Sequence, residues 1–295
     1  MLLDEERRPC AAEDPPAGGK HLHERKIPMN KKFLALLSAA AMMTTLMVGC
    51  GGDNSNNGSN QSNSGDDNAA LTTVTPGKLT MSTNATFPPY EMTDDNGNIV
   101  GIDVDIANAI AEKLGLELQV DDMGFDAALL AAQNGKSDIV MAGVTVNEDR
   151  LAVMDFSNSY ATGVQVVIVK EGSDVTLDNL GEQKIGTQRG TTGYIYCADD
   201  YGEDHVVAYD DGITAVQALM NGQVDCVVID NEPAKSYVES NPGLTILDTE
   251  YVVEDYAIGM AKGNTALQTA VNDALAELTA DGTIQSIVNE YITAE

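Results

Sequence analysis

Basic side chains are scarce in this sequence. Its 295 residues include 16 Lys and Arg against 46 Asp and Glu, which gives a formal net charge of -30. Proteins that bind nucleic acid by neutralising phosphates need a basic surface, so the composition excludes that class. Hydrophobic residues make up 43% and charged residues 21%. These ordinary proportions exclude both wholesale disorder and a polytopic membrane protein.

Signatures of catalysis and of metal binding are also missing. The sequence contains no GxSxG, HExxH, GxGxxG or P-loop, and His205 is the single His after Cys50. No cysteine or histidine cluster has metal-site spacing. We therefore expect no catalytic residue, no metal and no cofactor. Cys197 and Cys226 could form a disulfide in an exported protein, and two buried thiols are the alternative.

No apolar run is long enough to span a bilayer. The run from Phe33 to Val48 has 16 residues, fewer than the about 20 that a transmembrane helix needs. It follows a pair of lysines, so residues 29–49 are predicted to be a secretory signal peptide. Leu46 to Cys50 resembles a bacterial lipobox, with Met47 where Leu is usual. This motif predicts a lipid-modified cysteine, and a plain secreted protein is the alternative.

Two polar segments flank the signal. Residues 1–28 are charged and Pro-rich and do not suit a position ahead of a signal peptide, so we expect translation to begin at Met29. Residues 51–70 take 14 of their 20 positions from Asn, Ser and Gly. Such a segment cannot bury enough surface to fold. Residues 50–76 are therefore predicted to be the lipidated Cys50 and a flexible tether.

Strand and helix patterns alternate from Leu71 onward. Strands are expected at 78–83, 116–121, 138–142, 164–169, 183–187 and 225–230, and helices at 103–114, 125–134, 213–221, 265–279 and 283–291. This alternation predicts an α/β fold with largely parallel sheets. Residues 127–143 and 213–230 share a helix, an Asn-Gly-x-x-Asp turn and a buried strand, which indicates two lobes of similar construction. Because ligands bind beyond the carboxyl ends of such strands, residues 142–145 and 230–231 are expected to line one cleft.

Side chains near these strand ends suit an amino acid. The Arg150 guanidinium is a natural bidentate partner for a carboxylate, although spacing alone favours a surface pair with Glu148 or Asp149. Residues 190–193 precede a helix whose first N–H groups could accept an anion. Asp230 could pair with an ammonium group or cap the next helix.

Several sequence blocks in order resemble a known family. ATFPPYEM, GIDVDIANAIAEKLG, FDAALLAAQNGKSDIVMAGVTVNEDR, IGTQRGTTG, VDCVVIDNEPA and ADGTIQSIVNEY, within residues 77–294, resemble the bacterial extracellular solute-binding proteins of family 3, which serve amino-acid ABC importers. The resemblance implies a two-lobed type II periplasmic-binding-protein fold, with two mixed, mostly parallel sheets flanked by helices and joined by two crossing hinge strands. Its implied boundaries are 77–162 plus 258–295 for lobe 1, 163–257 for lobe 2, and crossings near Tyr160–Val164 and Asp255–Gly259.

The resemblance also implies roles for nine residues around a bound amino acid. They are Arg150 and the Thr192 N–H at its α-carboxylate, Asp230, Thr145 and the Gly143 carbonyl at its α-ammonium group, Phe87 and Phe125 as aromatic walls, and Asn84 and Gln188 at the distal end of its side chain.

The implied ligand is a polar L-amino acid. Relatives that select cations often carry a carboxylate where Asn84 stands, so a neutral ligand such as glutamine ranks slightly ahead of Lys, Arg or His. Two aromatic faces and an inward-turned Glu91 would instead favour a cation, and cystine is also open.

The implied partners are the permease and ATPase of an ABC importer, met by a monomer after hinge closure. The lipidated Cys50 would anchor this monomer to the outer face of the cytoplasmic membrane, in an extracellular or periplasmic location. An exported dehydratase-like enzyme on the same fold and an amino-acid sensor lipoprotein are the alternatives.

Protein isolated from its own cells is expected to begin at a lipid-modified Cys50, because the signal peptide ends there. Mass spectrometry of the N-terminal peptide measures this directly. Peptides from residues 1–28 would show that translation starts upstream of Met29, and an unmodified N-terminus would favour the plain secreted protein.

Overall fold

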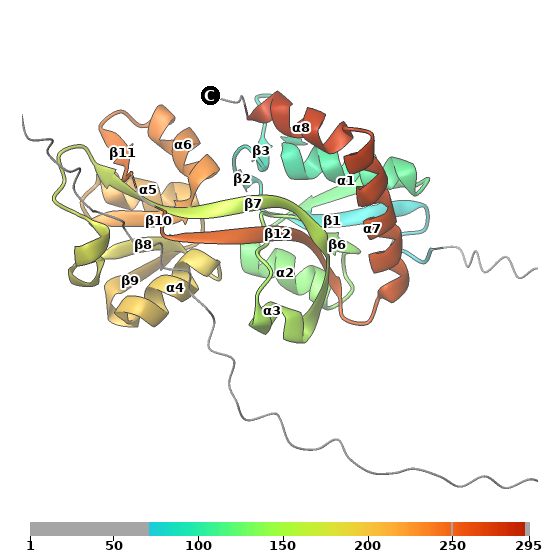
Figure 1. The fold of residues 1–295 in the computed structure, drawn as a ribbon, viewed down its shortest axis with the longest axis horizontal. Coiled ribbons are helices and arrows are strands. Elements are labelled where there is room, and N and C mark those ends of the chain that lie inside the picture. Colours follow the sequence, from blue (N-terminus) through green and yellow to red (C-terminus); the bar gives the residue numbers. More distant parts are fainter. Residues whose placement is uncertain (1–70, 249, 293–295) are drawn as a thin grey trace, which may run out of the picture. The chain divides into compact units, whose positions relative to one another are not determined.

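Nine strands form one mixed sheet in the residues that the computed structural model describes, 71–248 and 250–292 (Figure 1). The strand order is β5 (Glu117–Asp122), β1 (Lys78–Thr83), β6 (Ile139–Val140), β12 (Val252–Ala261), β7 (Met154–Lys170), β10 (Cys226–Asp230), β8 (Ile185–Gln188) and β9 (Val206–Tyr209), while β11 (Leu244–Ile246) also pairs with β7. A smaller antiparallel sheet contains β2 (Thr86–Phe87), β3 (Glu91–Thr93) and β4 (Ile99–Val100).

Helices cover this sheet at both ends. They are α1 (Ile102–Lys113), α2 (Phe125–Gln133), α3 (Glu148–Val153), α4 (Thr192–Tyr201), α5 (Gly212–Met220), α6 (Asn231–Ser240), α7 (Thr265–Ala280) and α8 (Thr283–Tyr291), with short 3-10 helices at Leu177–Glu182 and Glu203–His205. Helices α1, α7 and α8 contact one another at the β5–β1–β6 end, and α4 and α5 pack on β8 and β10 at the other. The predicted α/β class is therefore confirmed.

Two long strands connect the ends of the sheet. β7 and β12 pair antiparallel, with Asp255 opposite Thr162, and irregularities interrupt their register between Tyr256 and Gly259. β12 also pairs with β6, and β7 with β10, so the two sheets expected from the sequence are hydrogen-bonded into one. The polar stretch before residue 164 hides the first half of β7 from an apolar pattern. Backbone pairing with β12 makes that stretch a strand.

The repeated Asn-Gly-x-x-Asp turn forms the same structure twice. Helix α2 ends at Asn134 and α5 at Asn221, and each is followed by a glycine at positive φ, 64° and 71° respectively. The Asp138 carboxylate then accepts the Thr80 N–H at 2.8 Å. The Asp225 carboxylate accepts the Lys184 N–H at 2.8 Å. In both copies the aspartate fixes its own strand beside a parallel neighbour, as the sequence echo predicts.

The predictions about the first part of the chain fall outside the described residues. These are the start at Met29, the signal peptide 29–49, the lipidated Cys50 and the tether as far as residue 70. Among the described residues, no helix has the length and apolar character needed to cross a bilayer. Cys197 and Cys226 are both buried free thiols. The disulfide is thus absent and the alternative of two buried thiols is found.

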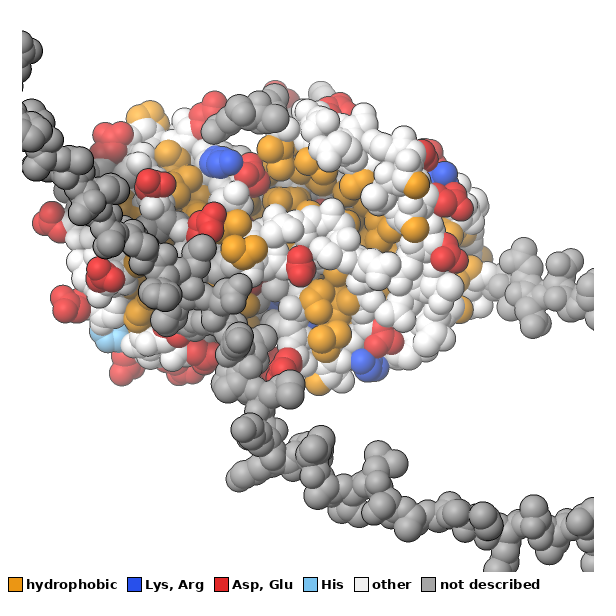
Figure 2. Space-filling model, viewed as in Figure 1, with side chains coloured by type: hydrophobic (Ala, Val, Ile, Leu, Met, Phe, Trp, Pro, Cys, Tyr) orange, Lys and Arg blue, Asp and Glu red, His pale blue; other side chains and the backbone are white. Residues whose placement is uncertain are grey.

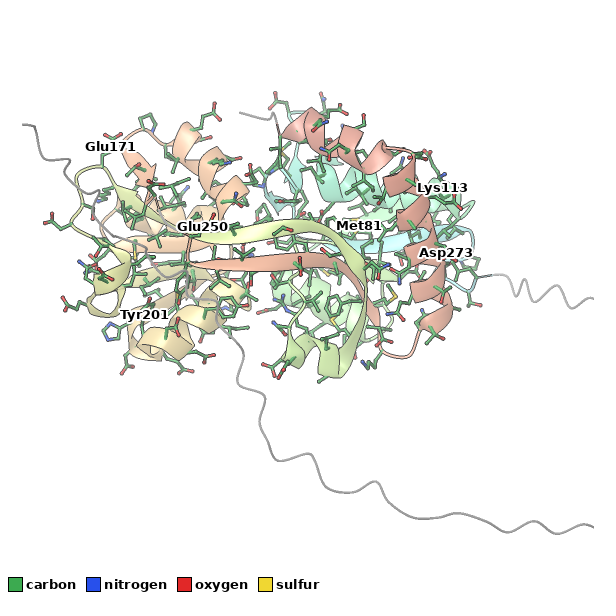
Figure 3. The ribbon with its side chains drawn as sticks, in the orientation of Figure 1. Met81, Lys113, Glu171, Tyr201, Glu250 and Asp273 are labelled. Atoms are coloured by element: carbon green, nitrogen blue, oxygen red, sulfur yellow. The ribbon has the colours of Figure 1, made fainter. Side chains whose placement is uncertain are left out.

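The surface is acidic and its charges are well separated. On the face drawn in Figure 2, acidic side chains outnumber basic ones and lie scattered among polar groups. Lys113, at the end of α1, pairs with Glu277 at 3.2 Å and Asp281 at 3.6 Å (Figure 3). Exposed pairs of this kind add little to stability because water screens them, so stability comes chiefly from the buried core.

Gly163→Ala is expected to destabilise the protein by about 1–3 kcal/mol, the usual cost of overpacking a core. A Cβ at Gly163 would clash with the hydroxyl of Tyr256, a fully buried side chain of β12. Urea unfolding measures the change. Gly124→Ala is the control, because a Cβ there meets nothing within 4 Å. Equal stability of the two variants would contradict this packing.

Candidate functional site

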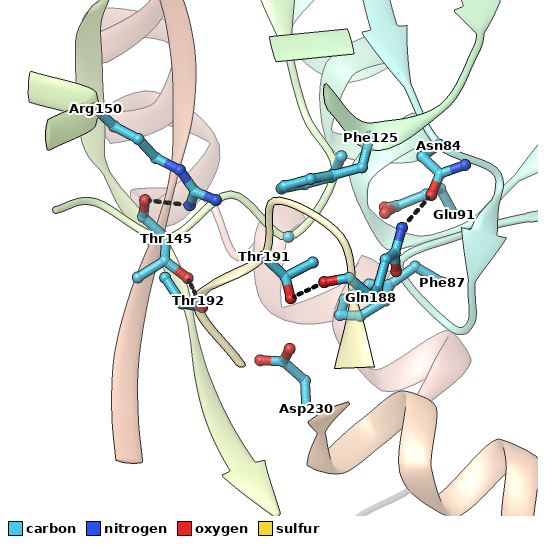
Figure 4. A pocket seen from close by; sticks show the side chains of 12 residues that line it. Asn84, Phe87, Glu91, Phe125, Thr145, Arg150, Gln188, Thr191, Thr192 and Asp230 are labelled. Carbon is cyan, nitrogen blue, oxygen red and sulfur yellow. Dashed lines mark hydrogen bonds between the residues drawn. The ribbon is translucent and has the colours of Figure 1, made fainter. Parts of the chain in front are cut away.

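A pocket lies where the strands end (Figure 4). The pocket is lined by Asn84 after β1, Phe87 in β2, Glu91 in β3 and Phe125 at the start of α2. Ala142, Gly143 and Thr145 follow β6, and Arg150 lies in α3. Gln188 ends β8, Thr191 and Thr192 stand at the start of α4, and Asp230 ends β10. Parallel strands that end at one edge bring distant segments together. The pocket therefore contains all nine residues that the sequence predicts for an amino-acid site, together with Glu91, Ala142 and Thr191.

Arg150 is buried at one end of the pocket, with 8% of its surface exposed. Its guanidinium donates to the Thr145 carbonyl at 2.8 Å and to the Gly190 carbonyl at 3.2 Å. The Phe125 ring lies 5.4 Å away. Among the described residues Arg150 has no carboxylate within 4.0 Å, so the surface pair with Glu148 or Asp149 is wrong. Burial lowers the pKa of Arg150, which marks a cation in need of an anionic partner.

Asp230 presents a buried carboxylate in the middle of the pocket. It stands at the N-cap position of α6 but makes no capping hydrogen bond, so the capping interpretation is wrong. It accepts hydrogen bonds from the Tyr256 hydroxyl and from the Gln165 amide. Burial, and then the neighbouring Glu254 carboxylate, raise the pKa of Asp230 to about 7. A cation beside it would restore full ionisation at neutral pH.

Backbone groups complete this end of the pocket. Gly143 has φ 55°, and a Cβ there would lie 2.7 Å from the Phe87 ring, so the close approach requires glycine. The Gly143 N–H donates to Asp103 at 3.0 Å. Thr192 stands in the first turn of α4, where helix N–H groups lack intrahelical partners. Its hydroxyl lies 3.5 Å from that of Thr145, so α4 closely approaches the loop after β6.

The opposite end of the pocket holds a buried carboxyl group without a cation in contact among the described residues. Glu91 is fully buried and lies against the Asp103 carboxyl group, with which it can share a proton. Burial and the nearby Asp103 raise the pKa of Glu91 well above its usual range. Beside it, the Gln188 amide donates to the Asn84 side chain at 2.9 Å. Figure 4 shows Arg150 and Glu91 at opposite ends, with the aromatic rings between them.

Residues 79–294 match the bacterial extracellular solute-binding proteins, family 3. The chain belongs to this family. A probable histidine-binding protein of Neisseria gonorrhoeae is 34% identical over 236 residues, which cover 77% of this chain and 88% of the relative. The L-cystine-binding protein TcyJ of Escherichia coli K12 is 30% identical over 223 residues, or 74% and 84% of the two chains.

Similar solved structures are also those of amino-acid-binding proteins. The arginine-, lysine-, histidine-binding protein ArtJ of Geobacillus stearothermophilus superposes with a TM-score of 0.70 at 30% identity, covering 74% of this chain and 96% of that one. The predicted type II periplasmic-binding-protein fold of this solute-binding protein is thereby confirmed. Its family is extracellular, so an exported location follows. The relatives named here are binding proteins and not enzymes.

Four buried polar residues behind the pocket of this solute-binding protein escaped the sequence analysis: Asp103, Gln165, Glu254 and Tyr256. Asp103 lies on the apolar face of α1, three or four residues before the buried Ile106 and Ala107. Gln165 interrupts the apolar run of β7. A polar residue within an otherwise apolar pattern was the signal available in both cases.

Asp103→Asn is expected to stabilise the ligand-free protein at pH 8 but not at pH 4. Burial raises the pKa of Asp103 to about 6. The folded state therefore holds a proton that the unfolded state loses near pH 4, and the free energy of unfolding falls as pH rises from about 4 to 6. Removing the charge should recover up to roughly 3 kcal/mol above pH 6.

Urea unfolding at the two pH values tests this difference. The asparagine can keep both existing bonds, from the Gly143 N–H and with the Tyr160 hydroxyl. Asp95→Asn, at an exposed position, is the matched control. The same stability change at pH 4 and pH 8 would contradict a buried, ionised Asp103.

Proposed function

We propose that this protein captures a cationic L-amino acid, with L-arginine the best fit, and delivers it to an ABC importer. The observation that carries the proposal is the order of buried charges along the pocket. A guanidinium without a carboxylate partner (Arg150) and a carboxyl group without a cation in contact (Glu91) stand at opposite ends, and the Asp230 carboxylate lines the pocket apart from both (Figure 4).

The α-carboxylate and α-ammonium groups have partners at the Arg150 end. The planar guanidinium can hold a carboxylate through two parallel hydrogen bonds. The Thr192 N–H at the start of α4 adds a donor in a favourable helix dipole. Asp230, the Thr145 hydroxyl and the Gly143 carbonyl supply acceptors for the ammonium group. Each ligand charge would then be paired inside the pocket, which is required because an unpaired buried charge costs several kcal/mol.

The side-chain end decides between a cationic and a neutral ligand. A guanidinium there would pair with Glu91 and bond to the Asn84 oxygen, between the faces of Phe87 and Phe125. A neutral ligand such as glutamine would leave Glu91 to stay protonated. The sequence ranks the neutral ligand slightly ahead because of the amide at Asn84. The buried Glu91 reverses that ranking, and relatives named for histidine, arginine and lysine support the change.

Capture is proposed to work by closure of two lobes. Lobe 1 is 77–162 plus 258–295, lobe 2 is 163–257, and the paired strands β7 and β12 bend between them. Four hydrogen bonds that involve side chains cross this boundary among the described residues, namely Asn84–Gln188, Thr145–Thr192, Arg150–Gly190 and Thr86–Tyr237. A ligand bound by both lobes favours the closed state, which the permease and ATPase complex would recognise.

We also propose how the protein is anchored and where it is located in the cell. A lipid on Cys50 would hold a monomer at the outer face of the cytoplasmic membrane, and the tether would let the domain reach the permease. The extracellular family supports an exported location. The signal peptide and the lipobox-like sequence support the anchor.

Glu91→Gln is expected to weaken L-arginine binding about 10- to 100-fold, because a hydrogen-bonded charge pair becomes a neutral contact. L-glutamine should bind this variant about as well as it binds the original. Arg150→Ala should abolish binding of both ligands without unfolding the protein, since both need the carboxylate clamp.

Isothermal titration calorimetry on protein unfolded and refolded to remove carried ligand measures these affinities. Glu112→Gln and Arg189→Ala, both at exposed positions, are the matched controls. An unchanged preference between arginine and glutamine in Glu91→Gln would contradict the cationic ligand. Normal binding by Arg150→Ala would contradict the clamp itself.

A further inference from the structure

A second buried carboxylate lies behind Asp230 and outside the pocket lining. Glu254 on β12 is 5% exposed and Gln165 on β7 is 1% exposed. The Gln165 amide nitrogen donates to Asp230 at 2.8 Å and to Glu254 at 2.8 Å. Its two hydrogens are therefore divided between two carboxylates that would otherwise repel each other.

The surroundings of this amide bridge contain little positive charge. Arg150 from α3 is the one cation whose charge acts on Glu254 and Asp230 in the described structure, and the hydroxyls of Tyr196 and Tyr256 face the same pair from α4 and β12. On the far side, Glu91 adds a further acidic group. One oxygen of Glu254 and the Gln165 carbonyl oxygen lack hydrogen-bond partners. Acidic groups thus outnumber cations in this cluster.

The residues of this cluster lie on the strands that would bend when the lobes close. Gln165 and Glu254 lie on β7 and β12, and Gln165 pairs in register with Asp230 of β10. The Gln165 side chain also lies against the first turn of α4, because a Cβ at Gly193 would meet its carbonyl oxygen at 2.9 Å. One side chain therefore touches the ammonium acceptor, the helix start beside the carboxylate clamp, and both long strands.

We propose that Gln165 and Glu254 are positioning residues of the ligand site: the Gln165 amide aims the Asp230 carboxylate at the α-ammonium group, and the Glu254 carboxylate keeps a proton on Asp230 until that group arrives. The inference rests on the proposed amino-acid site. The ligand ammonium replaces the proton as the positive charge of the cluster, and the proton leaves to solvent.

This exchange makes binding depend on pH with a definite sign. The pKa of Asp230 stands at about 7 in the empty pocket, raised by burial and by Glu254. Below that value the ligand must displace a proton, so affinity falls by up to about tenfold per pH unit as pH decreases. Above it the carboxylate is already ionised, and affinity becomes independent of this group.

Two isosteric variants test separately how Gln165 orients the Asp230 carboxylate and how the charge of Glu254 affects it. Gln165→Met keeps the volume but removes the amide, so affinity should fall about 10- to 100-fold at every pH. Glu254→Gln keeps the shape but removes the second charge, so Asp230 should ionise at lower pH. The fall in affinity should then begin at least about one pH unit lower, with less proton release at pH 6.5. Gln223→Met and Glu250→Gln, both at exposed positions, are the controls.

The measurement is isothermal titration calorimetry with L-arginine from pH 5.5 to 8.5, in buffers of different ionisation enthalpy that report proton release. Carbon-13 NMR of the Asp230 carboxyl group, without ligand, follows its titration independently. Variants that bind and titrate like the original protein would overturn this inference alone. An original protein that binds no amino acid would overturn the proposed function, and the ligand role of Gln165 and Glu254 with it.

Discussion

Unpaired charge in the protein interior is the constraint on which the rest of this structure depends. Arg150 is buried without a carboxylate partner, while Asp230 and Glu91 are buried without a cation in contact. Burial penalises each charge unless an opposite charge is supplied. A ligand with a carboxylate, an ammonium group and a cationic side chain supplies all three. We propose that such a ligand stabilises the pocket and that this stabilisation provides both the affinity and the closure.

These charged residues come together because the strands that precede them end at the same edge of the sheet. Parallel strands β1, β6, β8 and β10 deliver their following residues to one edge, and the long pair β7–β12 holds the two groups of strands in register. The same pair carries Gln165 and Glu254 behind Asp230. A change in the bend of these strands would therefore alter the carboxylate that receives the ligand ammonium. In the proposed mechanism, ligand recognition and lobe closure therefore involve the same residues.

Much of this arrangement could be predicted from the sequence, for identifiable reasons. The Asn-Gly-x-x-Asp turns mark both repeats because glycine and aspartate each have one structural task there. All nine residues that the family resemblance implies line one pocket, and several of them stand at or just after strand ends. The first half of β7 was missed because it is polar and depends on pairing with a strand about 90 residues away. The orientation of Glu91 and the amide bridge of Gln165 arise from tertiary packing, which local patterns do not encode.

A crystal structure with bound L-arginine tests the central claim most directly. We expect the α-carboxylate to bind the Arg150 guanidinium and the Thr192 N–H, and the α-ammonium group to bind Asp230. The ligand guanidinium should lie beside Glu91 and Asn84. Arginine bound in the reverse direction, with its guanidinium at Asp230 or its carboxylate away from Arg150, would contradict the assignment of charges. Arginine bound outside this pocket would contradict the account as a whole.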